Sequence, residues 1–226
     1  MTAESYIFLV GASRGVGEQI AYYLTQEQPM KVKALLRTET TRSQLESMGI
    51  KVAMGDALDG AAVEAAMLGA EPIEAVISTI GGLPQDGQRA DYLGNKNLID
   101  AAVKAGVKKF ILVSSIGTGN SVVALSPQAL ETLGAVLKEK EKAENYLIES
   151  GLTYTIVRPG GLKSEPATGN GVLTEDERIS GMIHRADVAQ LVCQCLVSER
   201  VNHKILSAVD RNMLFGNGTV AEFSLS

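Results

Sequence analysis

The stretch YIFLVGASRGVGEQIAYYL, residues 6–24, passes from a short apolar run through a glycine-rich turn into an amphipathic segment. The glycines of the turn are Gly11, Gly15 and Gly17. A strand, a turn of this kind and a helix form a phosphate-binding unit. In that unit the glycines allow a tight turn, close approach of a pyrophosphate and close packing of the helix on the strand. The stretch therefore predicts a nucleotide site at the N-terminal end of the first helix.

The same alternation of apolar runs and amphipathic segments continues along the chain. Nearly continuous apolar runs are typical of strands that helices cover on both faces. We expect strands at residues 6–10, 32–36, 50–54, 74–79, 109–115, 153–159 and 203–209. We expect helices at residues 16–25, 42–48, 61–68, 92–105, 133–150 and 185–197. This order predicts an α/β fold with right-handed crossovers, a doubly wound parallel sheet of the Rossmann type.

The domain organisation follows from the absence of a repeat or a linker at which the chain could be divided. We expect residues 1–226 to form a single NAD(P)-binding domain. Two irregular segments, 116–132 and 163–182, follow strand ends, where an open parallel sheet places its ligand crevice. We expect them to form the substrate side. Within the first segment, the stretch SPQALETLGAV (126–136) is mostly small and apolar. This composition suits either contact with a flat ring of the substrate or packing as a core helix.

Composition argues against several classes of partner. The net charge is −5 and tryptophan is absent, so we expect no nucleic-acid partner. Cys193 and Cys195 are two residues apart in a helical segment, so we expect neither a disulfide nor a metal site. The N-terminus lacks the features of a secretory signal, and no apolar run approaches the roughly 20 residues of a membrane span. We therefore expect a cytoplasmic protein, and the lysine-rich run of the helix at 133–150 favours a monomer.

Arginines at two positions predict which dinucleotide is bound. NAD-binding proteins of this type carry Asp or Glu about 20 residues after the glycine turn, on the adenosine ribose. This chain has Arg37 there, in ALLRTET, and Arg14 within the turn itself. A guanidinium presents several donors in a plane and suits a 2′-phosphate. We therefore expect NADP(H), with Arg14 facing outward over the turn.

Further cofactor contacts are expected where other strands end. Asp56 follows the third strand and is placed near the adenine edge; alternatively, it caps the helix that follows. Residues 78–81, after the fourth strand, are placed beside the ribose and phosphates. The predicted cofactor-binding residues are Gly11, Ser13, Arg14, Gly15, Val16, Gly17, Arg37, Asp56, Ala57, Thr79, Ile80, Gly81, Ser114, Lys140, Pro159, Gly160 and Gly161.

Taken in order, the motifs GASRGVG (11–17), LLR (35–37), GDALD (55–59), GNKNLIDAAVKAGVKKFILVSS (94–115) and YTIVRPGGL (154–162) resemble those of the atypical short-chain dehydrogenase/reductases. The resemblance covers about residues 5–210 and implies the Rossmann fold and NADP(H). Within that family the chain is most similar to the NmrA-like group, which includes plant chloroplast NADP(H)-binding proteins and flavin reductase/biliverdin-IXβ reductases. The glycine turn departs from the group's Gly-x-x-Gly-x-x-Gly pattern, because this chain has Gly-x-x-x-Gly-x-Gly.

The proton donor typical of the wider family is missing. Many members protonate a carbonyl oxygen with a tyrosine whose pKa is lowered by a lysine four residues later. The helix at 133–150 offers Lys140 at the lysine position but Val136 at the tyrosine position. Tyr92 and Lys96 have the same spacing, yet they precede the fifth strand, whereas the catalytic pair should follow it. The catalytic candidates that remain are Ser115 and Lys140.

Other polar residues near strand ends are expected to play structural parts. The hydroxyls of Ser114 and Ser115 can form local hydrogen bonds instead of contacting the cofactor. His184 and His203 are expected to be structural or exposed. Asp187 is expected to support the N-terminus of the helix at 185–197 by charge or capping.

The missing tyrosine favours an acceptor that needs no general acid from the protein. A flavin, a linear tetrapyrrole or a quinone spreads the arriving charge over many atoms and can take its proton from water. The resemblance to flavin and biliverdin-IXβ reductases implies the same class. We therefore expect an NADPH-dependent reductase of a small planar acceptor, with Ser115 orienting the acceptor or the nicotinamide. The alternative is a non-catalytic NADP(H)-binding protein that reports redox state or tethers a partner; a sugar-nucleotide epimerase is disfavoured.

Overall fold

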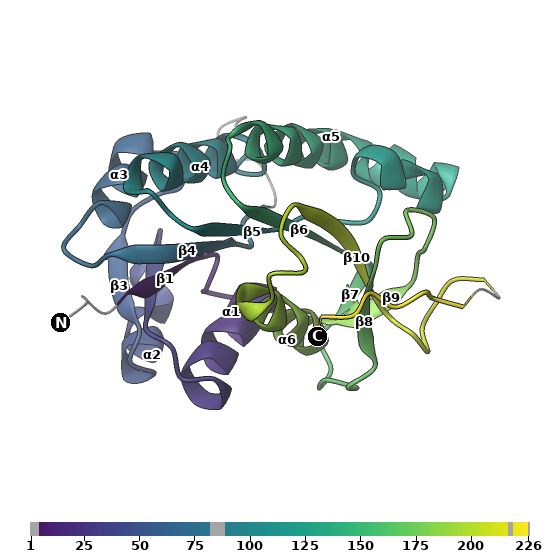
Figure 1. The fold of residues 1–226 in the computed structure, drawn as a ribbon, viewed down its shortest axis with the longest axis horizontal. Coiled ribbons are helices and arrows are strands. Elements are labelled where there is room, and N and C mark those ends of the chain that lie inside the picture. The colour runs from purple at the N-terminus through teal and green to yellow at the C-terminus, as the bar shows by residue number, and fades with distance from the viewer. Residues whose placement is uncertain (1–4, 82–88, 217–218, 226) are drawn as a thin grey trace.

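The computed structural model describes residues 5–81, 89–216 and 219–225 of the chain. An eight-stranded sheet in the order β3-β2-β1-β4-β5-β6-β10-β8 forms its centre (Figure 1). Its strands are β1 (Tyr6–Val10), β2 (Val32–Leu36), β3 (Lys51–Met54), β4 (Ile73–Ser78), β5 (Lys109–Val113), β6 (Tyr154–Pro159), β8 (Gly171–Thr174) and β10 (Lys204–Asp210). Neighbouring strands are parallel except β8, which is antiparallel to β10. The predicted Rossmann fold is confirmed.

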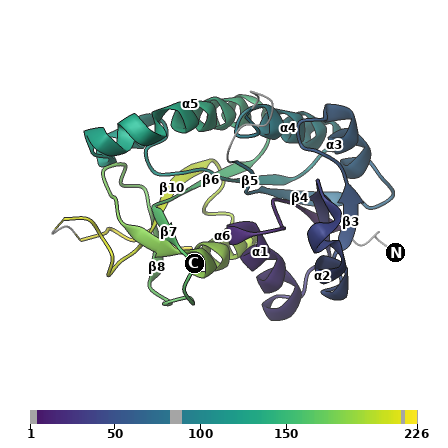
Figure 2. The same ribbon diagram turned by 180° about the vertical axis from the view of Figure 1, so that it is seen from behind.

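Helices cover both faces of the sheet (Figures 1 and 2). One layer holds α1 (Gly15–Tyr22), α2 (Arg42–Ser47) and α6 (Arg185–Val197), and the other holds α3 (Gly60–Met67), α4 (Leu93–Ala105) and α5 (Pro127–Glu149). A π-helical turn, Tyr23–Glu27, continues α1, and short 3-10 helices lie at Glu39–Thr41 and Gly119–Ala124. No helix among the described residues is long and apolar enough to cross a lipid bilayer.

The apolar strands are explained by burial on both faces. On β1, Ile7 and Leu9 pack into the core with α1, α2 and α6, whereas Phe8 and Val10 pack into the core with α3, α4 and α5. Side chains alternate between the faces of a strand, so a strand covered on both faces buries every side chain and favours apolar residues at successive positions. This is why an uninterrupted apolar run, instead of an alternating one, marks β1.

The first irregular segment, 116–132, differs from its expected form because it is partly helical. Helix α5 begins at Pro127, six residues before the expected start at Leu133. The side chain of Ser126 accepts a hydrogen bond from the Ala129 amide, and proline occupies the first helical turn. Serine followed by proline is a recognised helix start, since proline needs no amide partner there. Most of the first two turns of α5 are exposed, so 126–136 is not a core helix.

The second irregular segment, 163–182, also contains unexpected strands. A small two-stranded sheet pairs β7 (Gly161–Lys163) in parallel with β9 (Met182–His184), and β8 lengthens the main sheet. The backbones at Gly160 and Gly181 lie close together, because a Cβ on Gly160 would lie 2.3 Å from the carbonyl oxygen of Gly181. These strands are short, and their pairing depends on residues far along the chain, so no local pattern indicated them.

A buried ion pair ties α5 to the sheet. Arg158 of β6 donates from Nε and Nη2 to the two carboxylate oxygens of Glu144 at 3.1 and 2.6 Å, and these side chains are 4% and 2% exposed. Nη1 of Arg158 also donates to Oδ1 of Asn120 at 2.6 Å. Through one guanidinium, α5, β6 and the segment after β5 are held together.

Replacing only one partner of this pair should be strongly destabilising. Glu144→Leu leaves the Arg158 guanidinium buried without a counter-charge, and we expect a loss of about 3–5 kcal/mol in the free energy of unfolding. The double variant Glu144→Leu/Arg158→Met should recover most of that loss, because an apolar pair needs no charge compensation. Urea unfolding followed by circular dichroism measures both. A single variant no less stable than the double one would contradict this account.

Candidate functional site

A cleft of about 1270 Å³ runs along the carboxyl ends of β1 to β6, on the edge where the strand order reverses between β1 and β4. It exceeds the roughly 300–1,000 Å³ of a typical small-molecule site, and so has room for an extended ligand. Open parallel sheets bind ligands at such a switch point. The cleft therefore occupies the place that the glycine turn predicts.

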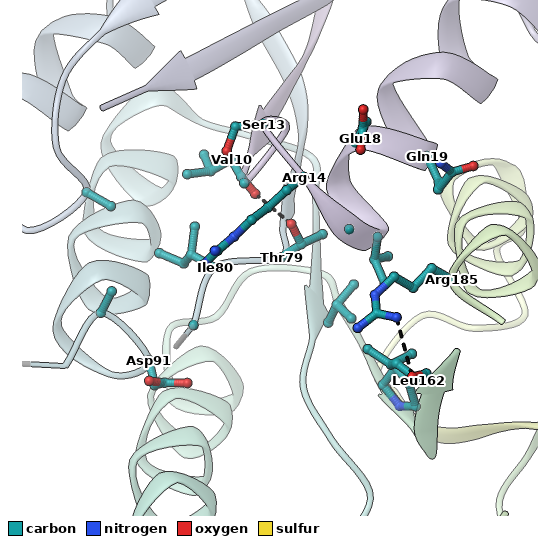
Figure 3. Close-up of a pocket in the computed structure, with 18 of the residues that line it drawn as sticks. Val10, Ser13, Arg14, Glu18, Gln19, Thr79, Ile80, Asp91, Leu162 and Arg185 are labelled. Atoms are coloured by element: carbon teal, nitrogen blue, oxygen red, sulfur yellow. Dashed lines mark hydrogen bonds between the residues drawn. The ribbon is translucent and has the colours of Figure 1, made fainter. Parts of the chain in front are cut away.

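The glycine turn forms one wall of the cleft (Figure 3). Gly11 and Gly15 have φ values of +97° and +63°, in the left-handed region that favours glycine. A Cβ on Gly17 would lie 2.1 Å from the carbonyl oxygen of Gly11. Thr79, at the end of β4, holds the turn by donating from its amide and hydroxyl to the carbonyl oxygen of Val10, at 3.0 and 3.1 Å. The close packing of α1 on β1 therefore depends on glycine at position 17.

The two arginines predicted to select the dinucleotide lie at this end of the cleft. Arg14 and Arg37 both line it and both are exposed. The Arg14 side chain is extended and points away from α1 (Figure 3). Among the described residues, neither guanidinium forms an ion pair with a carboxylate. Both are therefore available to an anionic ligand.

Asp56 lines the cleft near β3 and is not the cap of α3. Its Oδ1 accepts a hydrogen bond from the Leu58 amide at 2.9 Å, within its own turn. Asp59 caps α3 instead, accepting from the amides of Ala61 and Ala62. The helix-cap alternative for Asp56 is thus wrong.

The other end of the cleft holds Ser114, Ser115 and Lys140. The Ser115 hydroxyl donates to the carbonyl oxygen of Ile116 at 3.0 Å, so it makes the local hydrogen bond that was the alternative to a direct role. Lys140 is 18% exposed, and its Nζ lies 3.5 Å from Oδ1 of the fully buried Asp91. Asp91 also lines the cleft, and sequence reasoning missed it because an aspartate just before a helix has no special pattern.

The alternative Tyr92–Lys96 pair does not face the cleft. Neither residue lines it. Nζ of Lys96 binds a carboxylate oxygen of Asp100 at 2.7 Å and lies over the ring of Tyr146. These contacts, the Asp100 hydrogen bond above all, raise the pKa of Lys96 to about 12. A catalytic role for this pair has no support in the structure.

Apolar side chains of α5 and of the segment after β6 form part of the cleft wall, beside the polar Ser164 and Glu165. Helix α5 contributes Val136, one turn before Lys140, and Leu133, two turns before it. The segment after β6 contributes Leu162 and Pro166. Val136, at the position where the wider family carries tyrosine, therefore forms part of this apolar wall.

The segment after β7 is anchored by a buried polar cluster. Asp187 lies in the first turn of α6, where its charge favours the helix N-terminus, but it makes no cap hydrogen bond there. Its carboxylate accepts instead from the amides of Thr168 and Gly169, both at 2.9 Å. The Thr168 hydroxyl donates to Asp210 at 2.5 Å.

His184 completes this cluster. With Asp187 and Asp210 it forms a buried group whose potential metal-ligand atoms lie within 4.8 Å of one another. The hydrogen bonds to Thr168 and Gly169 show what the two carboxylates do here: they hold the segment 164–170 against the sheet. Sequence reasoning placed Asp187 at the helix end and missed this anchor.

Comparison with known proteins identifies the family. A family described as NAD(P)H-binding matches residues 11–199. The chain belongs to this family. Among solved structures, ChuY, described as an anaerobilin reductase from Escherichia coli, superposes with a TM-score of 0.83 at 35% identity, over 91% of this chain and 97% of that one.

Two plant proteins are also similar to this chain. Sanguinarine reductase of Eschscholzia californica is 31% identical, over 88% of this chain and 86% of its own length. TIC 62, a chloroplast protein of Arabidopsis thaliana, is 37% identical over 73% of this chain, which matches only 26% of that longer protein. The resemblance to the NmrA-like, atypical short-chain dehydrogenase/reductases is therefore confirmed. The chain is an oxidoreductase-family protein, and the expected cofactor, NADP(H), is confirmed at the level of the NAD(P)H-binding family.

The cleft brings together most of the residues predicted to bind the cofactor. Those that line it are Gly11, Ser13, Arg14, Gly15, Val16, Arg37, Asp56, Ala57, Thr79, Ile80, Gly81, Ser114, Lys140 and Pro159, and the catalytic candidate Ser115 lines it as well. Gly17, Gly160 and Gly161 lie outside the lining. A Cβ on Gly17 or Gly160 would meet a backbone carbonyl oxygen, whereas a Cβ on Gly161 would meet first the flexible side chain of Met182. Asp91 and Arg185 are cleft residues that sequence reasoning missed, whereas Ser164, Glu165 and Pro166 belong to the segment 163–182 that was expected to form the substrate side.

Proposed function

We propose that this protein is an NADPH-dependent reductase that transfers hydride to a planar, conjugated acceptor such as a flavin or a bilin-type tetrapyrrole. The observation that carries the proposal is the composition of the acceptor end of the cleft. Among the described residues that line the cleft there is no tyrosine, histidine or cysteine, and Val136 occupies the position of the usual proton donor. A conjugated acceptor tolerates this arrangement because it can take its proton from water.

Each end of the cleft has a part in the proposal. Arg14 and Arg37 bind the 2′-phosphate, and the free amides at the start of α1 bind the pyrophosphate. Lys140, held by Asp91, donates to the nicotinamide ribose. The cofactor supplies the hydride, and these residues hold the cofactor beside the acceptor. The acceptor gains this hydride and one proton from solvent, and NADP⁺ leaves.

The apolar wall supports the class of acceptor. Leu133, Val136 and Leu162 offer contact area to a ring system and no directed polar group. The reductase relatives agree with this chemistry, since one acts by its name on anaerobilin, a bilin, and the other on sanguinarine.

Steady-state oxidation of NADPH tests the proposal directly. The purified protein should oxidise NADPH above the uncatalysed rate with FMN, riboflavin or biliverdin, and should not reduce a simple aldehyde, which needs a general acid. NADH should be the poorer cofactor. If the protein binds NADPH yet turns over none of the flavins, tetrapyrroles or quinones, the reductase proposal fails.

A second candidate is a non-catalytic NADP(H)-binding protein that tethers a partner. The local hydrogen bond of Ser115 and the ion pair of Lys140 favour it, because both candidate catalytic groups are already engaged. The similarity to part of TIC 62 is compatible with it. Such a protein should bind a partner differently in the presence of NADP⁺ and NADPH and should show no turnover with any acceptor.

A further inference from the structure

Arg185, the first residue of α6, places a guanidinium in the cleft between the glycine turn and the segment after β7 (Figure 3). Its Nη1 donates to the carbonyl oxygen of Leu162 at 3.3 Å and to Oγ of Ser164 at 2.8 Å. Its Nε lies 3.7 Å from the position that a Cβ on Gly15 would take. The side chain therefore spans the two walls of the cleft at the start of α1.

The guanidinium has donors to spare. A guanidinium carries five N–H groups, and the two bonds from Nη1 leave those of Nε and Nη2. Within the described part of the chain, Nε and Nη2 have no hydrogen-bond partner, and no carboxylate forms an ion pair with Arg185. Lys140, by contrast, has Asp91. The Nε–Nη2 edge is the one that matches two oxygens of a phosphate or carboxylate in parallel.

The position of this edge indicates which anion it meets. Nε is the atom next to Gly15, and Gly15 opens α1. The start of the first helix after a glycine turn is where a dinucleotide places its pyrophosphate, since the amides and the helix dipole favour negative charge there. Arg37 follows β2 instead, where the adenosine ribose lies.

We propose that Arg185 is a pyrophosphate-binding residue of the cofactor site and links the bound cofactor to the segment that begins at Ser164. The proposal rests on the cofactor site of the proposed function. Nε and Nη2 bind the phosphate oxygens, while Nη1 keeps its bonds to Leu162 and Ser164. A bound dinucleotide therefore holds in place, through one side chain, the segment that borders the acceptor.

Affinities for three nucleotides, measured by isothermal titration calorimetry, separate this role from that of Arg37. NADPH and NADH both contain the pyrophosphate, whereas 2′-AMP carries only the adenosine and its 2′-phosphate. Arg185→Gln should raise the Kd for NADPH and for NADH by a similar factor, about 10- to 100-fold, because a charge-assisted bidentate contact is lost. The Kd for 2′-AMP should stay within about twofold of the wild-type value, because that ligand makes no contact with Arg185.

Further variants distinguish binding from support of the loop. Arg185→Lys keeps the charge but not the paired donors, and should give intermediate affinities. Ser164→Ala removes the hydrogen bond between Arg185 and Ser164 but keeps the guanidinium. It should therefore weaken NADPH binding far less than Arg185→Gln does. Arg178→Gln is the matched control: this arginine is exposed and does not line the cleft, so the affinities should not change.

Distinct results would overturn the proposals. Arg185 does not bind the pyrophosphate if Arg185→Gln binds NADPH as tightly as the wild type does. The same conclusion follows if this variant weakens the binding of 2′-AMP as much as the binding of NADPH. The same holds if Ser164→Ala weakens NADPH as much as Arg185→Gln, because the arginine then acts only through the loop. A wild-type protein that binds neither NADPH nor NADH would instead overturn the proposed function itself.

Discussion

Gly17→Ala should nearly abolish NADPH binding and also destabilise the fold. The added Cβ would lie 2.1 Å from the carbonyl oxygen of Gly11 and 2.6 Å from Oγ1 of Thr79. The nearest of these atoms belongs to the backbone, so α1 must move away from β1. We expect a loss of about 1–3 kcal/mol in the free energy of unfolding, as for other overpacked sites. A shift of the helix start by an ångström should raise the Kd for NADPH by about a hundredfold or more.

Gly134→Ala is the matched control for this prediction. Gly134 lies within α5, and a Cβ there meets nothing within 4 Å. Alanine should therefore stabilise the protein by about 0.5–1 kcal/mol, because glycine is unfavourable inside a helix. Urea unfolding measures the stabilities and calorimetry measures NADPH binding. If Gly17→Ala binds NADPH as tightly as Gly134→Ala does, the close packing of α1 on β1 is not what shapes the phosphate site.

Arg37→Asp should reverse the preference for NADPH over NADH. The substitution removes a charge-assisted contact with the 2′-phosphate and places a carboxylate where it repels that group. We expect kcat/KM for NADPH to fall on the order of a hundredfold. The value for NADH should change by less than about threefold, since its ribose hydroxyls can donate to the new carboxylate. If none of the tested acceptors is reduced, the Kd values for NADPH and NADH serve as the readout.

Arg42→Asp controls for the change in overall charge. Arg42 begins α2, pairs with Glu39 and Glu46 on the surface and does not line the cleft. It alters the net charge as Arg37→Asp does, so any general electrostatic effect on a polyanionic cofactor appears in both variants. Equal losses of kcat/KM for NADPH and NADH in Arg37→Asp would mean that Arg37 does not contact the 2′-phosphate.

The sequence by itself determined the seven parallel strands of the main sheet and the position of the site, because the signals for both are local. The uninterrupted apolar run of β1 indicates a strand buried on both faces, and the spacing of Gly11, Gly15 and Gly17 indicates a tight turn before a helix. Such patterns act over a few residues, through backbone sterics and side-chain periodicity. The start of α5 is also a local signal, the Ser126 cap followed by Pro127, although it lies within the segment 116–132 that we expect to be irregular.

Only the tertiary structure decided how the far wall of the cleft is built. Arg185 contacts Ser164 and lies beside the start of α1. Asp187 accepts a hydrogen bond from the Thr168 amide, and Thr168 belongs to a segment with no regular sequence pattern. In the sequence, an arginine and an aspartate at a helix start have many uses, of which binding a ligand or anchoring a loop is one. Which use applies depends on the groups that chain packing brings within hydrogen-bond reach, and these are about 20 to 170 residues away. Local chemistry therefore specifies the strand, turn and helix that begin this site, while long-range packing specifies the residues that complete it.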